Sequence, residues 1–204
     1  LTDHMSNLLV CPTSGSVENL RKESITTGVH LVGDVMYDAA TYFARAAEFH
    51  VNPLQSHKLA PSQFALVTCH RAENTDDWTR LNEIVQALSR IAEDMPVIFP
   101  AHPRTRAAIT SAGLSLSPGV RIIEPVSYLE MLILEKHAAV IVTDSGGVQK
   151  EAFFFGTPCV TLRDETEWTE TLDVGANVLA GAEAEAIVQL TKEQCGTGKI
   201  AVDA

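Results

Sequence analysis

The sequence predicts an α/β protein with a parallel β-sheet covered by helices on both faces. Short apolar segments alternate with helical patterns at least five times along the chain. These segments are apolar throughout rather than at every second position, which is typical of strands buried on both faces. Polar, ionisable loops follow them. Because ligands bind at the carboxyl ends of parallel strands, we expect the functional residues along one edge of the sheet.

The first 50 residues predict two strand–helix units. Apolar runs at residues 8–12 and 29–34 are expected to be strands, and helical patterns follow to about residues 23 and 48. Residues 50–62 then change in composition, with Pro53 and Pro61 among polar side chains. This segment predicts a break between two structural units.

The remaining chain predicts a regular alternation of strands and helices. Strands are expected at residues 64–69, 96–100, 120–123, 139–143, 158–163 and 177–180. A helix with an apolar face at 3.6-residue spacing follows residues 75–77, which supply a cap and acids. Ser127 and Glu130 predict a capping box before another helix. Shorter helices are expected from Arg104 and from Ala182, whereas residues 70–74 are predicted to form a loop.

Residues 139–151 predict a buried strand, a tight turn and the start of a helix. The N–H groups at such a helix start carry partial positive charge and bind phosphates well. Gly146 and Gly147 lack a Cβ atom and allow close approach, and Ser145 can cap the helix or donate its hydroxyl. Glu151 offers a carboxylate that can accept both hydrogen bonds of a ribose diol. An ordinary strand-to-helix turn is the alternative.

Further candidates follow other strands of the predicted sheet. His70 and His102 can donate to a phosphate or act as acid or base near neutral pH, or they are structural loop residues. Arginine at such positions suits phosphate or carboxylate recognition, although many loop arginines are simply solvated. The arginines are Arg71, Arg104 and Arg163. Glu73 and Asn74 are expected to brace the loop rather than to contact a substrate.

Composition narrows the function classes. With 15 basic and 26 acidic residues the net charge is −11, which disfavours a non-specific nucleic-acid binder. No apolar run approaches the roughly 20 residues of a membrane span. We expect a cytoplasmic protein with free, buried thiols at its four cysteines, and no metal or cofactor, since zinc, phosphate-loop and dinucleotide motifs are missing.

Several motifs in collinear order resemble the non-hydrolysing UDP-N-acetylglucosamine 2-epimerases of bacteria and archaea. They are His-Arg-Ala-Glu-Asn at 70–74, Pro-Ala-His-Pro-Arg-Thr at 100–105, Ser-Tyr-Leu at 127–129 and Thr-Asp-Ser-Gly-Gly-Val-Gln-Lys-Glu at 143–151. The segments at residues 3–9 and 33–38 also look like that family. The resemblance extends from residue 1 to about residue 185.

The resemblance implies one half of a glycosyltransferase-B-type fold, in which UDP-sugar lies between two Rossmann-like domains. Residues 1–50 would form the end of the N-terminal domain with a linker helix, and residues 51–204 the UDP-binding domain. The family interconverts UDP-GlcNAc and UDP-ManNAc by eliminating UDP and adding it again. By this resemblance, Ser145, Gly146 and Gly147 would bind the diphosphate, and Glu151 would bind the ribose. Val126 and Met131 would line the uracil pocket. His70 would be the catalytic histidine.

Two departures from the family pattern stand out. Trp168 replaces an arginine that would meet a phosphate, so Arg163 is a substitute for that contact. The acidic residues that would move the C2 proton belong to the N-terminal domain and are not in this chain, so we expect little turnover from the chain alone. A glycosyltransferase donor domain and a non-catalytic UDP-sugar-binding module are the alternatives. A second UDP-GlcNAc site at His102 and Arg104, and a homodimer, are left open.

Overall fold

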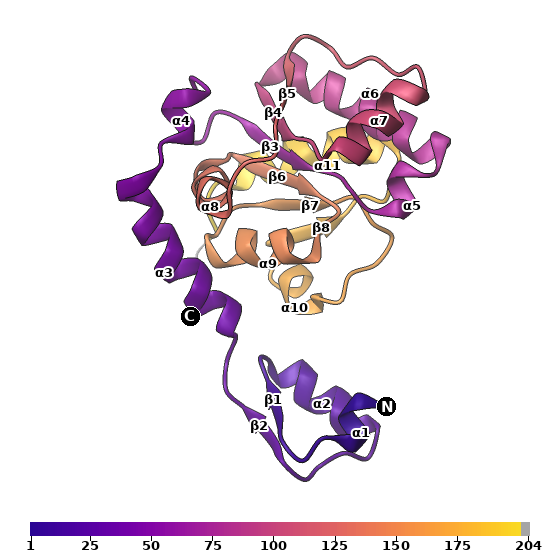
Figure 1. Ribbon diagram of the computed structural model, residues 1–204. Coiled ribbons are helices and arrows are strands. Elements are labelled where there is room, and N and C mark those ends of the chain that lie inside the picture. Colours follow the sequence, from indigo (N-terminus) through magenta and orange to yellow (C-terminus); the bar gives the residue numbers. More distant parts are fainter. Residues whose placement is uncertain (201–204) are drawn as a thin grey trace. The chain divides into compact units, whose positions relative to one another are not determined.

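The computed structural model describes residues 1–200 (Figure 1). The chain divides into two compact units, Leu1–Tyr42 and a second that begins at Phe43. The division falls within helix α3 (Val35–His50). The predicted domain boundary at residue 50 lies at the end of the same helix and stays a prediction.

The first unit is small and holds a two-stranded parallel sheet. It comprises α1 (Thr2–Met5), β1 (Leu9–Cys11), α2 (Ser14–Lys22) and β2 (Val29–Leu31). Leu9 pairs with Val29, which confirms the two predicted strands. The side chains of Leu8, Val10 and Val32 are exposed. Parallel strands are normally covered on both faces, so this unit presents apolar surface that it does not bury itself.

The second unit is built on a six-stranded parallel sheet, which confirms the predicted fold class. Its strand order is β5-β4-β3-β6-β7-β8. The strands are β3 (Ala65–Thr68), β4 (Val97–Pro100), β5 (Val120–Ile123), β6 (Val140–Thr143), β7 (Cys159–Thr161) and β8 (Asn177–Leu179). The central strands β3 and β6 are buried along their whole length.

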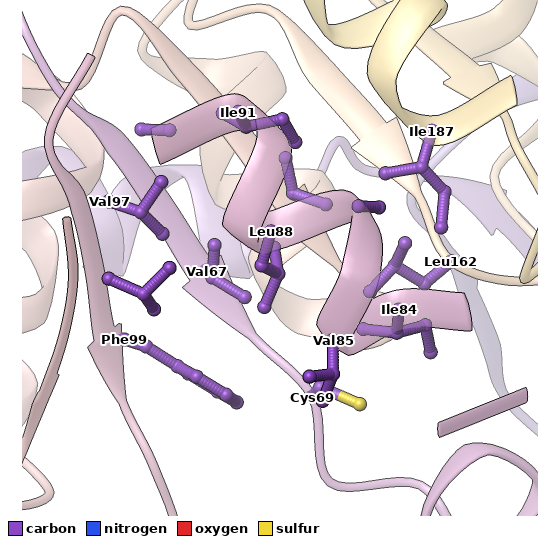
Figure 2. Packing of buried hydrophobic residues seen from close by; sticks show 14 of the residues in the cluster. Val67, Cys69, Ile84, Val85, Leu88, Ile91, Val97, Phe99, Leu162 and Ile187 are labelled. Carbon is purple, nitrogen blue, oxygen red and sulfur yellow. The ribbon is translucent and has the colours of Figure 1, made fainter. Parts of the chain in front are cut away.

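Helices cover both faces of this sheet. The helices of this unit are α4 (Pro53–Ser56), α5 (Ala72–Thr75), α6 (Trp78–Asp94), α7 (Pro103–Ser111), α8 (Tyr128–His137), α9 (Gly146–Phe154), α10 (Thr169–Asp173) and α11 (Ala184–Thr197). Ala65 and Val67 pack in one core with α6 and α11 (Figure 2), whereas Leu66 packs in another with α8 and α9. This alternation follows from the two-residue period of a strand.

The helix caps expected within residues 75–77 and at Ser127 are both present, whereas the first turn of α6 holds none of the acids expected there. The Asp77 carboxylate accepts hydrogen bonds from the N–H groups of Thr79 and Arg80 at the start of α6. Ser127 and Glu130 form the capping box of α8. Such caps satisfy donors that the first helical turn leaves free, at about 1 kcal/mol each.

The expectation of a loop at residues 70–74 was wrong, because Ala72–Thr75 forms helix α5. Helices α1, α4 and α10 were likewise not predicted. Each has only four or five residues. One turn shows no apolar repeat at helical spacing, so its sequence carries no periodic signal.

The chain order places a switch point between β3 and β6. From β3 the sheet grows through β4 to β5, and from β6 it grows through β7 to β8 in the opposite direction. The loops that follow β3 and β6 therefore diverge, which is where ligands bind in such sheets. Helices α5 and α9 begin in these two loops.

All four cysteines are free. Cys11, Cys69 and Cys159 are buried as expected, whereas Cys195 is partly exposed. In the part of the chain that the structure describes, no helix is both long and apolar enough to span a bilayer.

Candidate functional site

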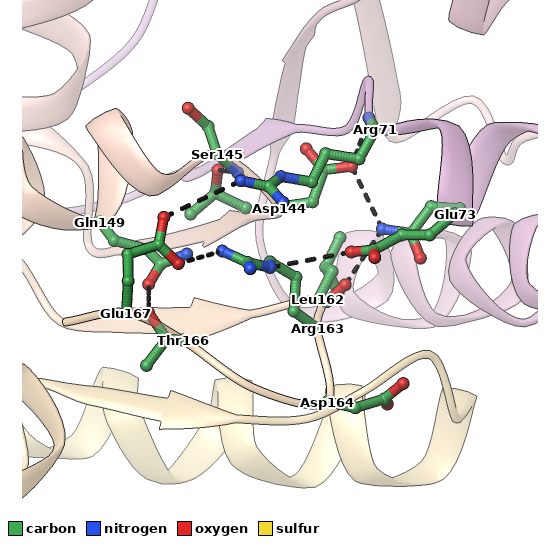
Figure 3. A network of polar contacts seen from close by, with 12 residues as sticks. Arg71, Glu73, Asp144, Ser145, Gln149, Leu162, Arg163, Asp164, Thr166 and Glu167 are labelled. Atoms are coloured by element: carbon green, nitrogen blue, oxygen red, sulfur yellow. Dashed lines mark hydrogen bonds and ion pairs between the residues drawn. The ribbon is translucent and has the colours of Figure 1, made fainter. Parts of the chain in front are cut away.

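The carboxylate of Asp144 joins the two sides of the switch point. Asp144 follows β6 and is fully buried. It accepts hydrogen bonds from the backbone N–H groups of His70 and Arg71, both at 2.9 Å, and from the Asn74 side-chain amide at 3.1 Å. His70 and Arg71 follow β3, and Asn74 lies within α5. Asp144 thus fixes the start of α5 against the end of β6 (Figure 3).

Asp144 also lies beside the ring of His70. Nδ1 of His70 is 3.5 Å from a carboxylate oxygen of Asp144, while half of the His70 side chain remains exposed. A carboxylate behind an imidazole orients the ring and favours a proton on the near nitrogen. The structure therefore gives His70 a fixed backbone and an accessible ring.

Ser145 caps helix α9 as the sequence predicts. Its Oγ accepts from the N–H of Val148 at 3.4 Å, and its own N–H donates to the Thr143 hydroxyl at 2.9 Å. The remaining N–H groups of the first turn have no intrahelical acceptor. They form a centre of partial positive charge directly after the switch point.

Gly146 is required by close packing at this helix start. A Cβ atom at Gly146 would meet the Glu167 carboxylate at 2.6 Å and the Trp168 indole nitrogen at 3.2 Å. At Gly147 the nearest atom to such a Cβ is the Ser145 Oγ at 3.9 Å. The loop after β7 therefore packs onto the N-terminus of α9 at Gly146.

The carboxylate of Glu167 lies at this N-terminus together with two arginines (Figure 3). Nη1 of Arg163 donates to it at 2.7 Å, and Nη2 of Arg71 is 3.9 Å away. Glu73 approaches Arg163 from the other side, with Oε1 3.7 Å from Nε. Burial alone would raise the pKa of Glu167, but a backbone hydrogen bond and the two arginines lower it below its ordinary value. The site is therefore suited to an anion, and a carboxylate of the chain occupies it.

Trp168 is held beside the same helix start by α9 and α10. The buried ammonium of Lys150 lies 4.5 Å from the centre of a Trp168 ring and 3.0 Å from the Glu170 carboxylate. Cation–π contact and ion pairing thus fix the indole. Its Nε1 is buried without an acceptor among the described residues, although indole N–H groups normally find one.

Glu151 lies on α9 about one and a half turns further along and is 8% exposed. The Tyr128 hydroxyl of α8 hydrogen-bonds to its carboxylate. Burial raises the pKa of Glu151, and its hydrogen bonds offset part of that rise. Val126 and Met131 pack against the apolar core that α9 shares with α8. The structure thus brings these predicted residues to the same pair of helices.

His102 and Arg104 lie at the end of β4, beyond β3. Nδ1 of His102 accepts from the N–H of Arg104 at 3.2 Å and caps α7. The Arg104 guanidinium donates to both carboxylate oxygens of Asp76 at 2.8 Å. These two residues therefore form their own cluster after a different strand, whereas the other polar candidates adjoin β3, β6 or β7.

Sequence reasoning assigned no role to Asp144 and Glu167. A signal for Asp144 exists, because an acid directly after a fully apolar strand must find donors at the sheet edge. Glu167 carries no such signal, since its partners Arg71 and Gly146 lie far away in sequence. Among the described residues, no group of three or more His, Cys, Asp or Glu side chains could hold a metal ion.

These features define a doubly wound α/β protein with histidine, arginine and a helix N-terminus at its switch point. The family model for UDP-N-acetylglucosamine 2-epimerases matches residues 1–200, and the chain belongs to this family. This confirms the resemblance found in the motifs.

Individual relatives support the assignment. The chain is 47% identical over 200 residues to the UDP-2,3-diacetamido-2,3-dideoxy-D-glucuronate 2-epimerase of Pseudomonas aeruginosa, covering 96% of this chain and 54% of that protein. It is 41% identical over 198 residues to the UDP-N-acetylglucosamine 2-epimerase of Methanocaldococcus jannaschii, covering 93% and 54%. The chain thus spans about half the length of these relatives.

Solved structures give the same result. The M. jannaschii enzyme in complex with UDP-GlcNAc and UDP matches with a TM-score of 0.85 and 39% identity, covering 96% of this chain and 56% of that chain. The Neisseria meningitidis enzyme bound to UDP-GlcNAc matches with a TM-score of 0.85 and 27% identity, covering 98% and 58%.

We expect Asp144→Ala to destabilise the protein by about 3 kcal/mol or more, because it leaves three donors without their charged acceptor. Urea unfolding followed by circular dichroism would measure the free energy. Asp164→Ala removes an exposed acid from the loop after β7, where an exposed ion pair contributes about 0–1 kcal/mol, and serves as the control. A loss below about 1 kcal/mol in Asp144→Ala would contradict the role given to Asp144.

Proposed function

We propose that this chain is the nucleotide-binding half of an enzyme that interconverts UDP-GlcNAc and UDP-ManNAc. The observation that carries the proposal is the N-terminus of α9, where two arginines and a close-packed glycine surround one carboxylate. Membership of the epimerase family and structures of relatives with UDP-GlcNAc and UDP support it.

In the proposed complex the nucleotide diphosphate takes the place of the Glu167 carboxylate. Its oxygens accept from the first N–H groups of α9 and from the Ser145 hydroxyl, with Gly146 and Gly147 allowing close approach. Arg163 and Arg71 then exchange Glu167 for phosphate oxygens. After this exchange each arginine still has an anionic partner.

The nucleoside would lie along α8 and α9. The Glu151 carboxylate would accept from the ribose hydroxyls, as its limited exposure and high acceptor capacity allow. Val126 and Met131 would contact the uracil, Val126 through its backbone polar groups. Tyr128 lies between these two positions in sequence and already bonds to Glu151.

Reversible inversion at C2 would follow elimination and re-addition of UDP. The C2 proton leaves as the bond from C1 to the UDP oxygen breaks, and the reverse steps deliver a proton to the opposite face. His70 is the group of this chain with a suitable position, since its ring is oriented by Asp144 and half exposed. Further acid and base groups must come from the half of the relatives that this chain does not span.

The first unit of the structure supports the proposal that this chain is one half of a larger enzyme. Its two parallel strands expose Leu8, Val10 and Leu31, whereas strands of a complete α/β sheet bury such residues. We infer that further chain covers them in the whole enzyme. A homodimer and a cytoplasmic location remain part of the proposal.

A second substrate is favoured by one relative. The P. aeruginosa protein with 47% identity is named for a UDP-sugar with two acetamido groups and a carboxylate. The same UDP-binding half suits either substrate, because the contacts proposed above are with the nucleotide.

We expect the 204-residue chain to bind UDP weakly, with a Kd on the order of 1 mM or below, since it supplies only half of a two-domain cleft. Isothermal titration calorimetry would measure this affinity. Affinity should fall at least about tenfold in a Ser145→Ala, Glu151→Ala double variant, which loses two polar contacts. Glu185→Ala, an exposed charge change on α11, is the control. Equal affinities in the three proteins would exclude the site.

We expect Glu167→Gln to bind UDP about three- to tenfold more tightly than the wild type. The amide keeps the shape of the side chain but removes the negative charge that competes for the arginines and the helix N-terminus. Glu165→Gln makes the same charge change at an exposed position of that loop and should leave the Kd within about twofold. Weaker binding by Glu167→Gln would show instead that Glu167 assists the ligand.

We expect no conversion of UDP-GlcNAc or of the diacetamido-glucuronate substrate by the chain alone, because half of the acid–base groups are missing. A chimaera with the N-terminal half of the P. aeruginosa relative should regain turnover, detected by proton NMR of the products. His70→Ala in that chimaera should lower kcat by about 10² to 10⁴. A chimaera that binds UDP but converts neither sugar would favour a non-catalytic binding module.

A further inference from the structure

A second buried carboxyl group lies behind Glu151. Glu135 on α8 is 0% exposed, and no N–H or O–H of the described chain is fixed as a donor to either of its carboxyl oxygens. The carboxyl group of Glu151 on α9 is within hydrogen-bond reach of it. Two ionised carboxylates offer only acceptors, so a hydrogen bond between them needs one proton.

The surroundings favour a single proton on this pair. Burial, followed by the charge of Glu151, raises the pKa of Glu135 well above its ordinary value. Burial also raises the pKa of Glu151, though its partners counter this in part. The more deeply buried carboxyl keeps the proton, because removal from water costs most for its charged form. Glu151, with some access to solvent, keeps the negative charge.

Among the described residues, further titratable side chains lie on the elements around this pair. The Tyr128 hydroxyl contributes its proton as a donor to Glu151, and its pKa is raised. The Cys159 thiol of β7 is neutral, because burial raises its pKa to about 12. The Lys150 ammonium of α9 pairs with Glu170. Lys199 donates to the hydroxyl of Thr157, whose own proton goes to the Glu135 backbone carbonyl.

We propose that Glu135 is a positioning residue for ribose recognition: it holds the one proton of the Glu135–Glu151 pair and donates it to Glu151. This inference rests on the proposed function, in which Glu151 binds the ribose. Two donors, Glu135 and Tyr128, then occupy two acceptor sites of the Glu151 carboxylate and fix its orientation. The two sites left over match the two hydroxyls of a ribose diol.

The protonation state is measured directly by carbon-13 NMR of the side-chain carboxyl groups at pH 7, with the Glu135 signal assigned by its loss in Glu135→Gln. We expect Glu135 to show the chemical shift of a protonated acid and Glu151 that of a carboxylate. An ionised Glu135 at pH 7 overturns the proposal, whatever the nucleotide affinity.

The pH dependence of protein stability gives a second test of whether Glu135 is protonated. The folded-state pKa of Glu135 is raised, so the native protein retains a proton that the unfolded chain releases above about pH 4.5. Relative to Glu135→Gln, the wild type should therefore lose stability as pH rises, up to tenfold in the unfolding constant per pH unit. Glu130→Gln is the control on the same helix. The lowered pKa of Glu130 gives the opposite dependence, with stability lost as pH falls.

The ribose role is tested by calorimetry with UDP and with 2′,3′-dideoxyuridine diphosphate, which lacks both hydroxyls. Glu135→Leu removes the donor and should weaken UDP binding about tenfold, whereas Glu135→Gln, which keeps a neutral donor, should restore it. With the dideoxy ligand the three proteins should agree. An equal loss for both ligands would show a merely structural effect and overturn the ribose role.

The outcomes separate the two proposals. Failure of the wild type to bind UDP overturns the proposed function and the ribose role with it, while the NMR signal still decides where the proton lies. UDP binding that is indifferent to Glu135→Leu overturns this inference alone. If Glu135→Leu does not fold, Glu135→Ser, which shortens the side chain, replaces it in the same comparison.

Discussion

The buried carboxylate of Asp144 is the interaction on which the rest of the site depends. It joins the end of β6 to the residues after β3 through hydrogen bonds to two backbone N–H groups and one amide. The loops after β3 and β6 lead away in opposite directions at this point. Backbone hydrogen bonds between strands therefore cannot hold the two loops together. Asp144 supplies that connection and at once orients His70 and aligns α5. A carboxyl group can be buried here only because hydrogen-bond donors converge on it.

An acidic protein with a net charge of −11 can still bind an anion when positive potential is local. Here that potential comes from the first turn of α9 together with Arg71 and Arg163. Glu167 occupies it and keeps both arginines paired. Such a carboxylate avoids the cost of leaving the largely buried guanidinium of Arg163 unpaired, but it competes with any ligand that uses the same donors.

The sequence was sufficient for the parts of the fold that repeat. Apolar strands, a helix cap among residues 75–77 and the capping box at Ser127 each carry local signals, and all were confirmed. One-turn helices such as α5 were missed, because four residues show no period. The site could be predicted from the sequence only in part. The contact of Glu167 with Gly146 joins residues 21 positions apart, and that of Glu135 with Glu151 joins residues 16 positions apart. Fold topology, and no local pattern, brings them together.

The position of Glu135 is unfavourable for stability alone. A leucine or methionine of similar volume in the core between α8 and α9 would bury apolar surface with no carboxyl to desolvate. Strongly shifted pKa values cluster at functional sites. The carboxyl group that shifts the pKa of Glu135 is that of Glu151, the residue whose acceptor capacity the ribose would need. In our proposal, Glu135 lowers the stability of the protein so that Glu151 can present one charge in one orientation to the ribose.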